Sequence, residues 1–454
     1  MDFHKKVLIA GTGISGLNAG KLLLEKGAEI IFYDDNSALD VQKLLSQFDE
    51  NDPVRVVLGS ISEKILKDVD LMVISPGIPV DSEIANTVRD ANIPIWSEIE
   101  LAYQVGAGHL AAITGTNGKT TTTSLVGEIF ADYTKNSFAV GNIGIPYTEV
   151  ALSMDEDTYT VAEVSSFQLE TIDEFRPHVS AVLNVTPDHL NRHYTMENYA
   201  SVKLDICRNQ TADDYLVLNY DDPITRSMAK DKRVNAKVIF FSRLENLSEG
   251  ICLKDDHIVL READKETDVI DTKDLILLGG HNIENYMAGI AVAYYMGIPL
   301  SHIVSVLKTF KGVAHRIEFV KEVNGVTYYN DSKGTNPDAA IKGIQAMNRR
   351  TVLIGGGYDK GVAFDDWIKA FDGKVKKLIL IGQTAQMIAD TAKKYDFTDV
   401  EFCDDLKQAV TRCYQIAEPG EAVLLSPACA SWGMFDNYEQ RGDMFKQYVN
   451  ELGA

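Results

Sequence analysis

The chain has 454 residues, of which 45% are hydrophobic and 24% are charged, a size that predicts two to four globular domains, with three as the central expectation. Its formal net charge of −22 disfavours a nucleic-acid partner, because phosphate backbones attract basic surfaces. Five scattered cysteines without a C-x-x-C pair, no signal-peptide pattern and no apolar run of about 18–20 residues predict a reduced, cytoplasmic protein without a zinc site or a membrane partner.

Residues 1–97 alternate short apolar runs with helical stretches, which predicts a parallel α/β sheet of Rossmann-like type. The first run leads into Gly11-x-Gly13-x-x-Gly16, a spacing typical of loops that hold a pyrophosphate. Asp34 and Asp35 end the second run, where a dinucleotide-binding domain places an acid for the ribose hydroxyls. Taken alone, this block fits an NAD-dependent oxidoreductase. UDP also carries a pyrophosphate and a ribose, so the same loop can hold it.

Residues 98–312 repeat the α/β theme and contain a second phosphate loop. AITGTNGKTTTT (112–123) is a shortened G-x-x-G-K-T loop between a predicted strand and a predicted helix. The glycines let backbone N–H groups approach phosphate oxygens, and Lys119 can reach the terminal phosphates. The hydroxyl of Thr120 can join the ligand shell of Mg²⁺. The block is therefore predicted to be a P-loop ATPase-type domain.

Two further features of this block leave alternatives open. Glu163 lies near the end of an apolar strand, where it is either a metal ligand or an ordinary strand-end acid. Asp188, His189 and His193 occupy a polar segment after a buried strand. From the residues alone, a helix cap or a hydrogen-bonded loop histidine is the favoured interpretation of that segment.

Residues 313–454 begin with a predicted hairpin, because Asn324-Gly325 is the preferred pair for a type I′ turn. Three apolar runs then alternate with helical segments, which predicts a Rossmann-like C-terminal α/β domain. The predicted fold is therefore α/β with three domains, at residues 1–97, 98–312 and 313–454.

Several segments together resemble one family, the Mur ligases of peptidoglycan synthesis, and they occur in its order along essentially the whole chain. They are GTNGKTT, AEVSSFQLE, NVTPDHLNRH, YASVK, HNIEN, AHRIE, NDSKGTNPDA and SPACASWGMFDNYEQRG. SPGIP, SSFQLE and SPACASW are similar in particular to the members that add D-glutamate. Any one of these segments is a weak indicator of the family, but eight of them in the family's order are highly specific.

The resemblance implies an N-terminal UDP-substrate domain, a central ATP-binding domain and a C-terminal amino-acid-binding domain. It implies ATP-dependent addition of D-glutamate to UDP-N-acetylmuramoyl-L-alanine, in a cytoplasmic step of peptidoglycan precursor synthesis. The γ-phosphoryl group of ATP activates the L-alanine carboxylate as an acyl phosphate, and the D-glutamate amine displaces phosphate. The expected cofactors are ATP and two Mg²⁺ ions, the expected partners are small molecules only, and a monomer is expected.

The resemblance also implies roles for individual residues. Lys119, His189 and Lys203 match catalytic positions. The implied magnesium ligands are Thr120, Glu163, His189 and Lys203, with Lys203 carrying a CO₂-derived carbamate. An ammonium about 4 Å from a divalent cation would cost about 8 kcal/mol at an effective dielectric of about 20, so a modified lysine is physically reasonable there. The implied ATP-binding residues are Gly115, Thr116, Asn117, Gly118, Lys119, Thr120, Thr121, Asn282, Asn285, Arg316 and Asp331.

Two further sets concern the other substrates. The implied contacts to the UDP-sugar are Ile14, Ser15, Asp35, Asn36, Ser75 and Asn142. The implied contacts to D-glutamate are Lys333, Thr335, Lys360, Ser431, Trp432 and Tyr438. Without the resemblance, several of these residues have plain structural explanations: a helix-surface lysine at Lys203, a surface ion pair at Arg316, and a core residue at Trp432.

Three rival functions remain open at this point. The first is another amide ligase of the same superfamily, either Mur-type with a different amino acid or folylpolyglutamate-type. The second is a NAD(P)-dependent dehydrogenase with an incidental lysine loop. The third is a nucleotide-binding switch protein without ligase activity.

Overall fold

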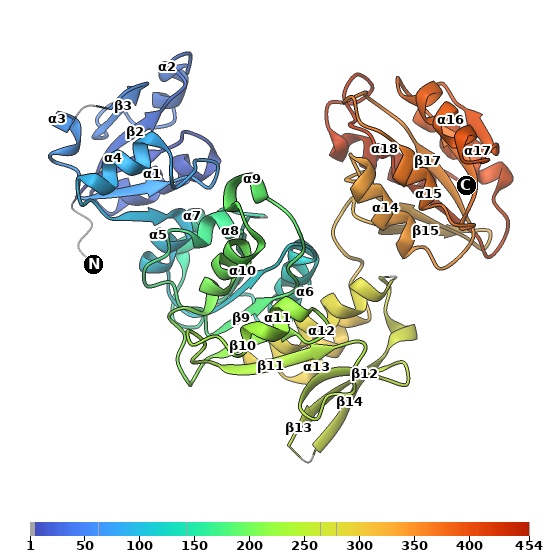
Figure 1. Ribbon diagram of the computed structural model, residues 1–454, viewed down its shortest axis with the longest axis horizontal. Coiled ribbons are helices and arrows are strands. Elements are labelled where there is room, and N and C mark those ends of the chain that lie inside the picture. Colours follow the sequence, from blue (N-terminus) through green and yellow to red (C-terminus); the bar gives the residue numbers. More distant parts are fainter. Residues whose placement is uncertain (1–4, 62, 143, 264, 278, 454) are drawn as a thin grey trace. The chain divides into compact units, whose positions relative to one another are not determined.

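The described residues of the computed structural model form three sheets, each with helices packed on it (Figure 1). The structure describes residues 5–61, 63–142, 144–263, 265–277 and 279–453. Within these ranges, no helix is long and apolar enough to cross a membrane.

The first sheet is parallel and has the strand order β3-β2-β1-β4-β5. Its strands are β1 (Lys6–Ala10), β2 (Glu29–Asp34), β3 (Val54–Leu58), β4 (Leu71–Ile74) and β5 (Ile95–Ser97). Its helices are α1 (Ile14–Glu25), α2 (Val41–Leu45), α3 (Glu63–Leu66) and α4 (Glu83–Asp90). The order reverses between β1 and β4, so the loops after these two strands meet where open α/β sheets bind ligands.

The second sheet has the order β14-β13-β12-β11-β10-β9-β6-β8-β7. Its strands are β6 (His109–Thr114), β7 (Ser137–Gly141), β8 (Tyr159–Glu163), β9 (Val179–Val182), β10 (Tyr215–Asn219), β11 (Lys237–Ser242), β12 (Gly250–Lys254), β13 (His257–Glu262) and β14 (Lys265–Asp271). β6 lies between β9 and β8, and all three run parallel, so their carboxyl ends gather at one edge.

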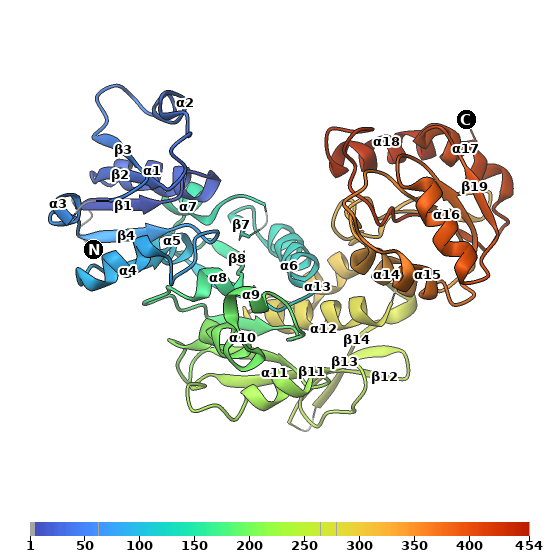
Figure 2. The same ribbon diagram turned by 45° about the horizontal axis from the view of Figure 1, so that its top comes forward.

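The helices and 3₁₀ turns that accompany the second sheet lie before, between and after its strands in the sequence. They are α5 (Glu98–Val105), α6 (Lys119–Tyr133), α7 (Tyr147–Val150), η1 (Ala151–Ser153), α8 (Ser166–Leu169), α9 (Leu190–His193), α10 (Met196–Leu204), η2 (Asp205–Cys207), α11 (Pro223–Met228), η3 (Thr272–Asp274), α12 (Gly280–Tyr295) and α13 (Leu300–Leu307). α7 packs against both α1 and α5, so helices of the first two sheets share contacts (Figure 2).

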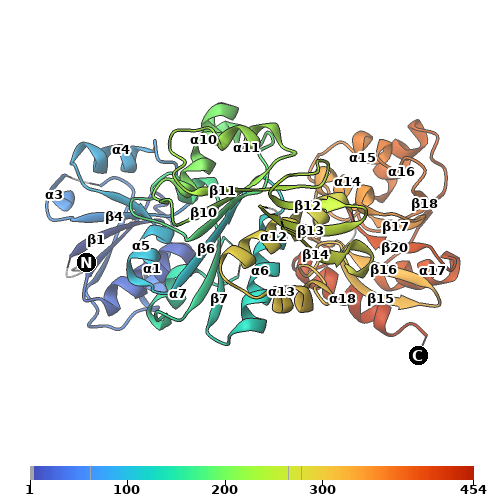
Figure 3. The same ribbon diagram turned by 90° about the horizontal axis from the view of Figure 1, so that it is seen from below.

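The third sheet has the order β15-β16-β20-β17-β18-β19, and β20 lies between β16 and β17 (Figure 3). Its strands are β15 (Glu318–Val323), β16 (Val326–Asn330), β17 (Thr351–Gly355), β18 (Val375–Leu380), β19 (Val400–Phe402) and β20 (Ala422–Leu425). Its helices are α14 (Pro337–Ala346), α15 (Asp365–Lys369), α16 (Ala385–Lys394), α17 (Leu406–Ile416) and α18 (Tyr438–Asn450). The antiparallel β15–β16 pair turns at Asn324-Gly325, with positive φ at both residues, as predicted for a type I′ turn.

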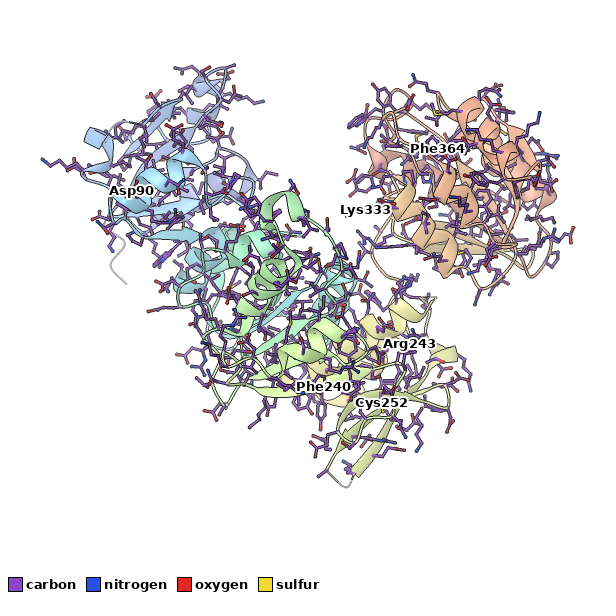
Figure 4. The ribbon with its side chains drawn as sticks, viewed as in Figure 1. Asp90, Phe240, Arg243, Cys252, Lys333 and Phe364 are labelled. Atoms are coloured by element: carbon purple, nitrogen blue, oxygen red, sulfur yellow. The ribbon has the colours of Figure 1, made fainter. Side chains whose placement is uncertain are left out.

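The chain divides into two units. The first runs to Ile270 and resumes over Glu284–Val306, and the second holds Asp271–Ile283 and the residues from Leu307 onward. One apolar core cluster continues from the first sheet into the second, while the third sheet has its own clusters, around residues such as Phe364 (Figure 4). The predicted boundary at 97 falls inside the first unit, and the boundaries at 97 and 312 stay predictions. The predicted α/β class is confirmed.

Candidate active site

The first glycine loop follows β1 and packs against the loop after β4. A Cβ on Gly11 would lie 2.7 Å from Ser75 Oγ, and a Cβ on Gly16 would lie 2.0 Å from the carbonyl oxygen of Gly11. A Cβ on Gly13 would meet no atom within 4 Å. Gly11 and Gly16 therefore permit close packing, while Gly13 presents an open backbone edge. Ser75 Oγ is shielded from solvent and has no hydrogen-bond partner among the described residues.

The acids after β2 divide into a structural one and an exposed one. Asp34 Oδ2 accepts a hydrogen bond of 2.7 Å from Thr12 Oγ1, and its Oδ1 accepts one of 3.0 Å from the Asn36 N–H. Asp34 thus ties the glycine loop to the end of β2. Asp35 and Asn36, both predicted to contact the UDP-sugar, are exposed beside it.

The second glycine loop follows β6 and leads into α6. Lys119 folds back, so that its Nζ donates to the carbonyl oxygens of Gly115 and Thr116, both at 2.9 Å. Gly118 caps the helix with φ +85°, a conformation that favours glycine. Asn184, after β9, binds the backbone of Asn117 twice, accepting from its N–H at 2.8 Å and donating to its carbonyl at 3.0 Å. Asn184 was not among the predicted site residues, and its position after a buried strand was the available signal.

Lys203 lies on α10 and reaches the same loop. Its Nζ donates to the carbonyl of Gly115 at 2.8 Å, so one oxygen receives both Lys119 and Lys203. The side chain is buried, and its Nζ lies 4.5 Å from the ring centroid of Tyr199. Burial and the nearby Lys119 charge lower the pKa of Lys203 to about 7. The alternative of a helix-surface lysine is therefore wrong.

Glu163 ends β8, the strand beside β6. It is 1% exposed, and its Oε1 accepts a hydrogen bond of 2.9 Å from Asn142 Nδ2. Its Oε2 is buried without a hydrogen-bond partner in the described chain. A carboxylate oxygen left in this state suits a hard cation such as Mg²⁺. No three His, Cys, Asp or Glu side chains gather as a metal cage in the part described, and Mg²⁺ commonly completes its shell with water and phosphate.

The two histidines after β9 have different environments. His189 adopts φ +52° at the start of α9, is exposed, and lies 4.9 Å from the Phe167 ring by centroids. His193 is fully buried, and its Nε2 lies 2.9 Å from Ser166 Oγ. Burial lowers the pKa of His193 to about 4. His193, the last residue of α9, is therefore a buried structural histidine with its Nε2 hydrogen-bonded and its Nδ1 without a hydrogen-bond partner among the described residues. His189, at the N-cap of α9, faces solvent.

The residues expected at adenosine lie in both units. Asn285 is buried in the first unit, with its Oδ1 3.4 Å from Thr122 Oγ1 and closely approached by Gly118. Asn282, one helical turn before it on α12, is also buried and belongs to the second unit. In the second unit, Asp331 follows β16 and accepts a hydrogen bond of 2.7 Å from Ser426 Oγ. Burial raises the pKa of Asp331 to about 7, against the opposing effect of Arg316.

The residues expected at D-glutamate all belong to the second unit, after three neighbouring strands. Lys333 (Figure 4) follows β16, and its Nζ lies 5.6 Å from the ring centroid of Tyr438. Lys360 follows β17, and its Nζ lies 5.0 Å from the Trp432 ring. Trp432 is 54% exposed, so the alternative of a core residue is wrong. Ser431, beside it after β20, is buried, and Thr335 is half-buried.

A pocket of about 230 Å³ lies in the first unit. Three residues expected at the UDP-sugar line it, namely Ile14, Ser15 and Asn142, and Asn142 also binds Glu163. The pocket therefore extends from the first glycine loop to Asn142, whose side chain binds the carboxylate at the end of β8. Glu98 and Gln168, which were not among the predicted site residues, line it as well.

Family models match three stretches of the chain in order. They are the "Mur ligase MurD-like, N-terminal domain" at residues 5–97, the "Mur ligase middle domain" at 113–293 and the "Mur ligase, glutamate ligase domain" at 315–429. The chain belongs to the Mur ligase family. The predicted resemblance is confirmed, and the dehydrogenase alternative is not supported by any of these matches.

Similar proteins extend this result over the full length. The chain is 53% identical to the UDP-N-acetylmuramoylalanine–D-glutamate ligase of Lachnospira eligens, over 99% of each chain. It is 45% identical to the protein of that name in Clostridioides difficile, again over 99% of each. Among solved structures it resembles the UDP-N-acetylmuramate–alanine ligase MurC of Thermotoga maritima, with a TM-score of 0.57 at 18% identity, covering 98% of this Mur ligase and 99% of the other chain. The predicted three-domain fold is confirmed by this likeness.

Proposed function

We propose that this Mur ligase joins D-glutamate to UDP-N-acetylmuramoyl-L-alanine with consumption of ATP, as part of peptidoglycan precursor synthesis. The observation that carries the proposal is the meeting of Lys119 and Lys203 on the carbonyl of Gly115, within a phosphate loop. Full-length relatives of 45–53% identity that bear the name of this ligase support it.

The second loop is the ATP site of the proposal. Carboxylate and triphosphate are both anions, so their encounter needs compensating positive charge. Lys119 supplies it by exchanging its two carbonyl contacts for phosphate oxygens. Loop amides and the N-terminus of α6 add partial positive charge. The proposed set at ATP is Gly115, Thr116, Asn117, Gly118, Lys119, Thr120, Thr121, Asn282, Asn285, Arg316 and Asp331.

Magnesium fits the donor set around this loop. Glu163 Oε2, Thr120 Oγ1 and His189 are the proposed protein ligands, with phosphate and water completing each shell. When bound, Mg²⁺ would neutralise charge on the transferring phosphoryl group. Glu163 is oriented for this by its hydrogen bond from Asn142.

Lys203 is proposed to carry a carbamate. Its amine is buried beside Lys119, so a second ammonium there is electrostatically unfavourable. The neutral amine adds to CO₂, forms an N–C bond and releases one proton. The product is an anion, which suits a magnesium ion better than an ammonium does.

The remaining substrates are assigned to the other loops. The UDP handle is proposed to bind at Ile14, Ser15, Asp35, Asn36, Ser75 and Asn142. D-Glutamate is proposed to bind at Lys333, Thr335, Lys360, Ser431, Trp432 and Tyr438, where two lysines offer charge for its carboxylates. The protein is further proposed to act in the cytoplasm as a monomer.

An amino-acid panel tests the proposal. Purified protein is incubated with ATP, Mg²⁺ and UDP-N-acetylmuramoyl-L-alanine, and product is detected by mass spectrometry. Incorporation of D-glutamate alone is the expected result. Incorporation of L-glutamate, L-lysine or L-alanine instead would point to another ligase of the superfamily. ATP hydrolysis that no amino acid stimulates would favour the nucleotide-switch alternative.

A further inference from the structure

Glu98 is a buried acid that lines the pocket of the first unit. It begins α5, directly after β5, and is 5% exposed. The pocket that it lines is also lined by Ile14 and Ser15 of the first loop and by Asn142. Glu98 therefore shares one pocket with the proposed UDP loop and with Asn142, which binds the carboxylate of Glu163.

One oxygen of Glu98 is held in place by a neighbouring amide. Gln168 Nε2 donates to Glu98 Oε1 at 2.7 Å. The orientation of that amide is fixed, because Gln168 Oε1 accepts from both the N–H and the hydroxyl of Ser165, at 2.7 and 2.9 Å. Gln168 can thus present only its NH₂ group to Glu98.

The other oxygen of Glu98 lacks a partner in the part of the chain that the structure describes. Oε2 is shielded from solvent and receives no hydrogen bond from any described residue. Burial raises the pKa of Glu98 to about 7. Buried polar atoms nearly always have a partner, so an unpartnered oxygen on a carboxylate whose residue lines a pocket points to a ligand.

Glu100, two residues further along α5, shows what a purely structural acid looks like here. It is fully buried, and its oxygens accept the backbone N–H groups of Asp173, Glu174 and Phe175 at 2.8 to 3.0 Å. Its contacts account for its burial, since they fix the segment after α8. No described residue makes a comparable contact that would account for the burial of Glu98 Oε2.

We propose that Glu98 is a specificity-determining residue of the acceptor site, whose Oε2 accepts a hydrogen bond from an N–H or O–H group of the muramoyl-alanine part of the substrate. This inference rests on the proposed function. The UDP handle lies at the first loop and the reacting carboxylate near Glu163, so the part between them fills the pocket. That part carries the sugar donors and the amide N–H of the alanyl link.

The substitution Glu98→Gln tests the proposal with little change of shape. A carboxylate accepts from two donors at once, whereas a glutamine must turn its own NH₂ toward either Gln168 or the ligand. We expect affinity for UDP-N-acetylmuramoyl-L-alanine to fall about tenfold or more by calorimetry, with the affinity for ATP unchanged. In turnover assays the KM for the acceptor should rise, while the KM for D-glutamate stays the same.

A second ligand separates the two donor sources. UDP-N-acetylmuramic acid has the sugar but lacks the alanyl amide. Loss of affinity confined to the alanylated substrate assigns the bond to the amide N–H, and equal loss with both ligands assigns it to the sugar. Unchanged affinity for both ligands would overturn the inference.

Glu100→Gln is the matched control, and it should lower the midpoint of thermal unfolding without changing acceptor affinity. If Glu98→Gln does not fold, Glu98→Asp retains the carboxyl group but withdraws it from the pocket, and the same loss of affinity is expected. A wild-type protein that binds no acceptor would overturn the proposed function and this inference together. Wild-type binding that the Glu98 variants retain in full would overturn this inference alone.

Discussion

The two glycine-rich loops of the first unit share a shape but differ in charge. Both follow a central parallel strand and lead into a helix, α1 in one case and α6 in the other. The loop after β1 is held by the hydroxyl of Thr12 on Asp34 and presents Gly13 as an open backbone edge. The loop after β6 gathers Lys119 and Lys203 on one carbonyl, next to a strand that ends in Glu163.

This difference in charge distinguishes a loop that only binds a nucleotide from a loop that also takes part in phosphoryl transfer. Glycines allow a backbone to approach a phosphate, and this serves any nucleotide. Transfer of a phosphoryl group also needs cations and metal ligands at the transferring oxygen atoms. Only the second loop gathers such groups within the described chain, so the first loop is suited to carry a nucleotide that stays intact.

Removal of Lys119 gives the largest expected effect on this comparison. Lys119→Ala should lower kcat by about 10²- to 10³-fold or more, because the charge on the transferring phosphoryl group loses its main protein cation. Acyl-phosphate formation in a single turnover is the measurement. Lys135→Ala, at an exposed lysine beyond α6, is the control. Retained turnover in Lys119→Ala would contradict the assignment of the second loop.

Removal of Lys203 is the next largest effect. Lys203→Ala should lower kcat by about 10²-fold, and short carboxylic acids should partly restore it by occupying the place of the carbamate. Mass spectrometry of the intact wild-type protein under CO₂ checks for the modification directly. A bare lysine together with absent rescue would count against the carbamate.

A methyl group added to the first loop should weaken binding of the acceptor substrate and leave the binding of ATP unchanged. Gly13→Ala has room in the structure, and Gly13 has φ −73°, so folding should be unchanged. The KM for the acceptor should rise about tenfold, because the methyl group occupies the side on which the diphosphate approaches. Gly16→Ala is the contrasting variant, since its Cβ would meet the Gly11 carbonyl, and it should lower the unfolding midpoint. A changed KM for ATP in Gly13→Ala would break the comparison.

The smallest expected effect is on the free energy of unfolding, through the hydrogen bond that holds the first loop. Thr12→Val keeps the branched shape but removes the hydrogen bond to Asp34, which should cost about 1 kcal/mol in the free energy of unfolding. Denaturant titration measures this difference. Thr12→Ser retains the hydroxyl and should stay close to wild type. Equal losses in both variants would show that the hydrogen bond is not the cause.

Much of the fold could be predicted, because its strands are apolar runs between turn residues. The β15–β16 hairpin and the strand-loop-helix units at both glycine loops follow from local patterns. No strand was predicted at β7, β14 or β19, which lie at the edges of their sheets. β7 follows a polar segment, β14 is largely polar itself, and β19 has only Val400–Phe402. An apolar run between turn residues predicts a strand from its own sequence. An edge strand with few apolar residues forms only by pairing with its neighbour in the sheet.

The site could be predicted only as a set of residues. Nothing local indicates that Lys203 shares a carbonyl with Lys119, because α10 and α6 are distant in sequence. Glu98 and Glu100 have the same chemistry and lie on one short helix, yet only Glu98 keeps an unpartnered oxygen. Such differences arise from tertiary contacts, here with the segment after β8, and no periodicity encodes them.

Binding of the two nucleotides to the two loop variants tests the central claim most directly. Calorimetry would measure the affinities of wild type, Gly13→Ala and Lys119→Ala for UDP-N-acetylmuramoyl-L-alanine and for a non-hydrolysable ATP analogue. We predict that Gly13→Ala weakens only the acceptor and that Lys119→Ala weakens only the ATP analogue. A reversed pattern, or loss of both ligands in both folded variants, would contradict the assignment of one nucleotide to each loop.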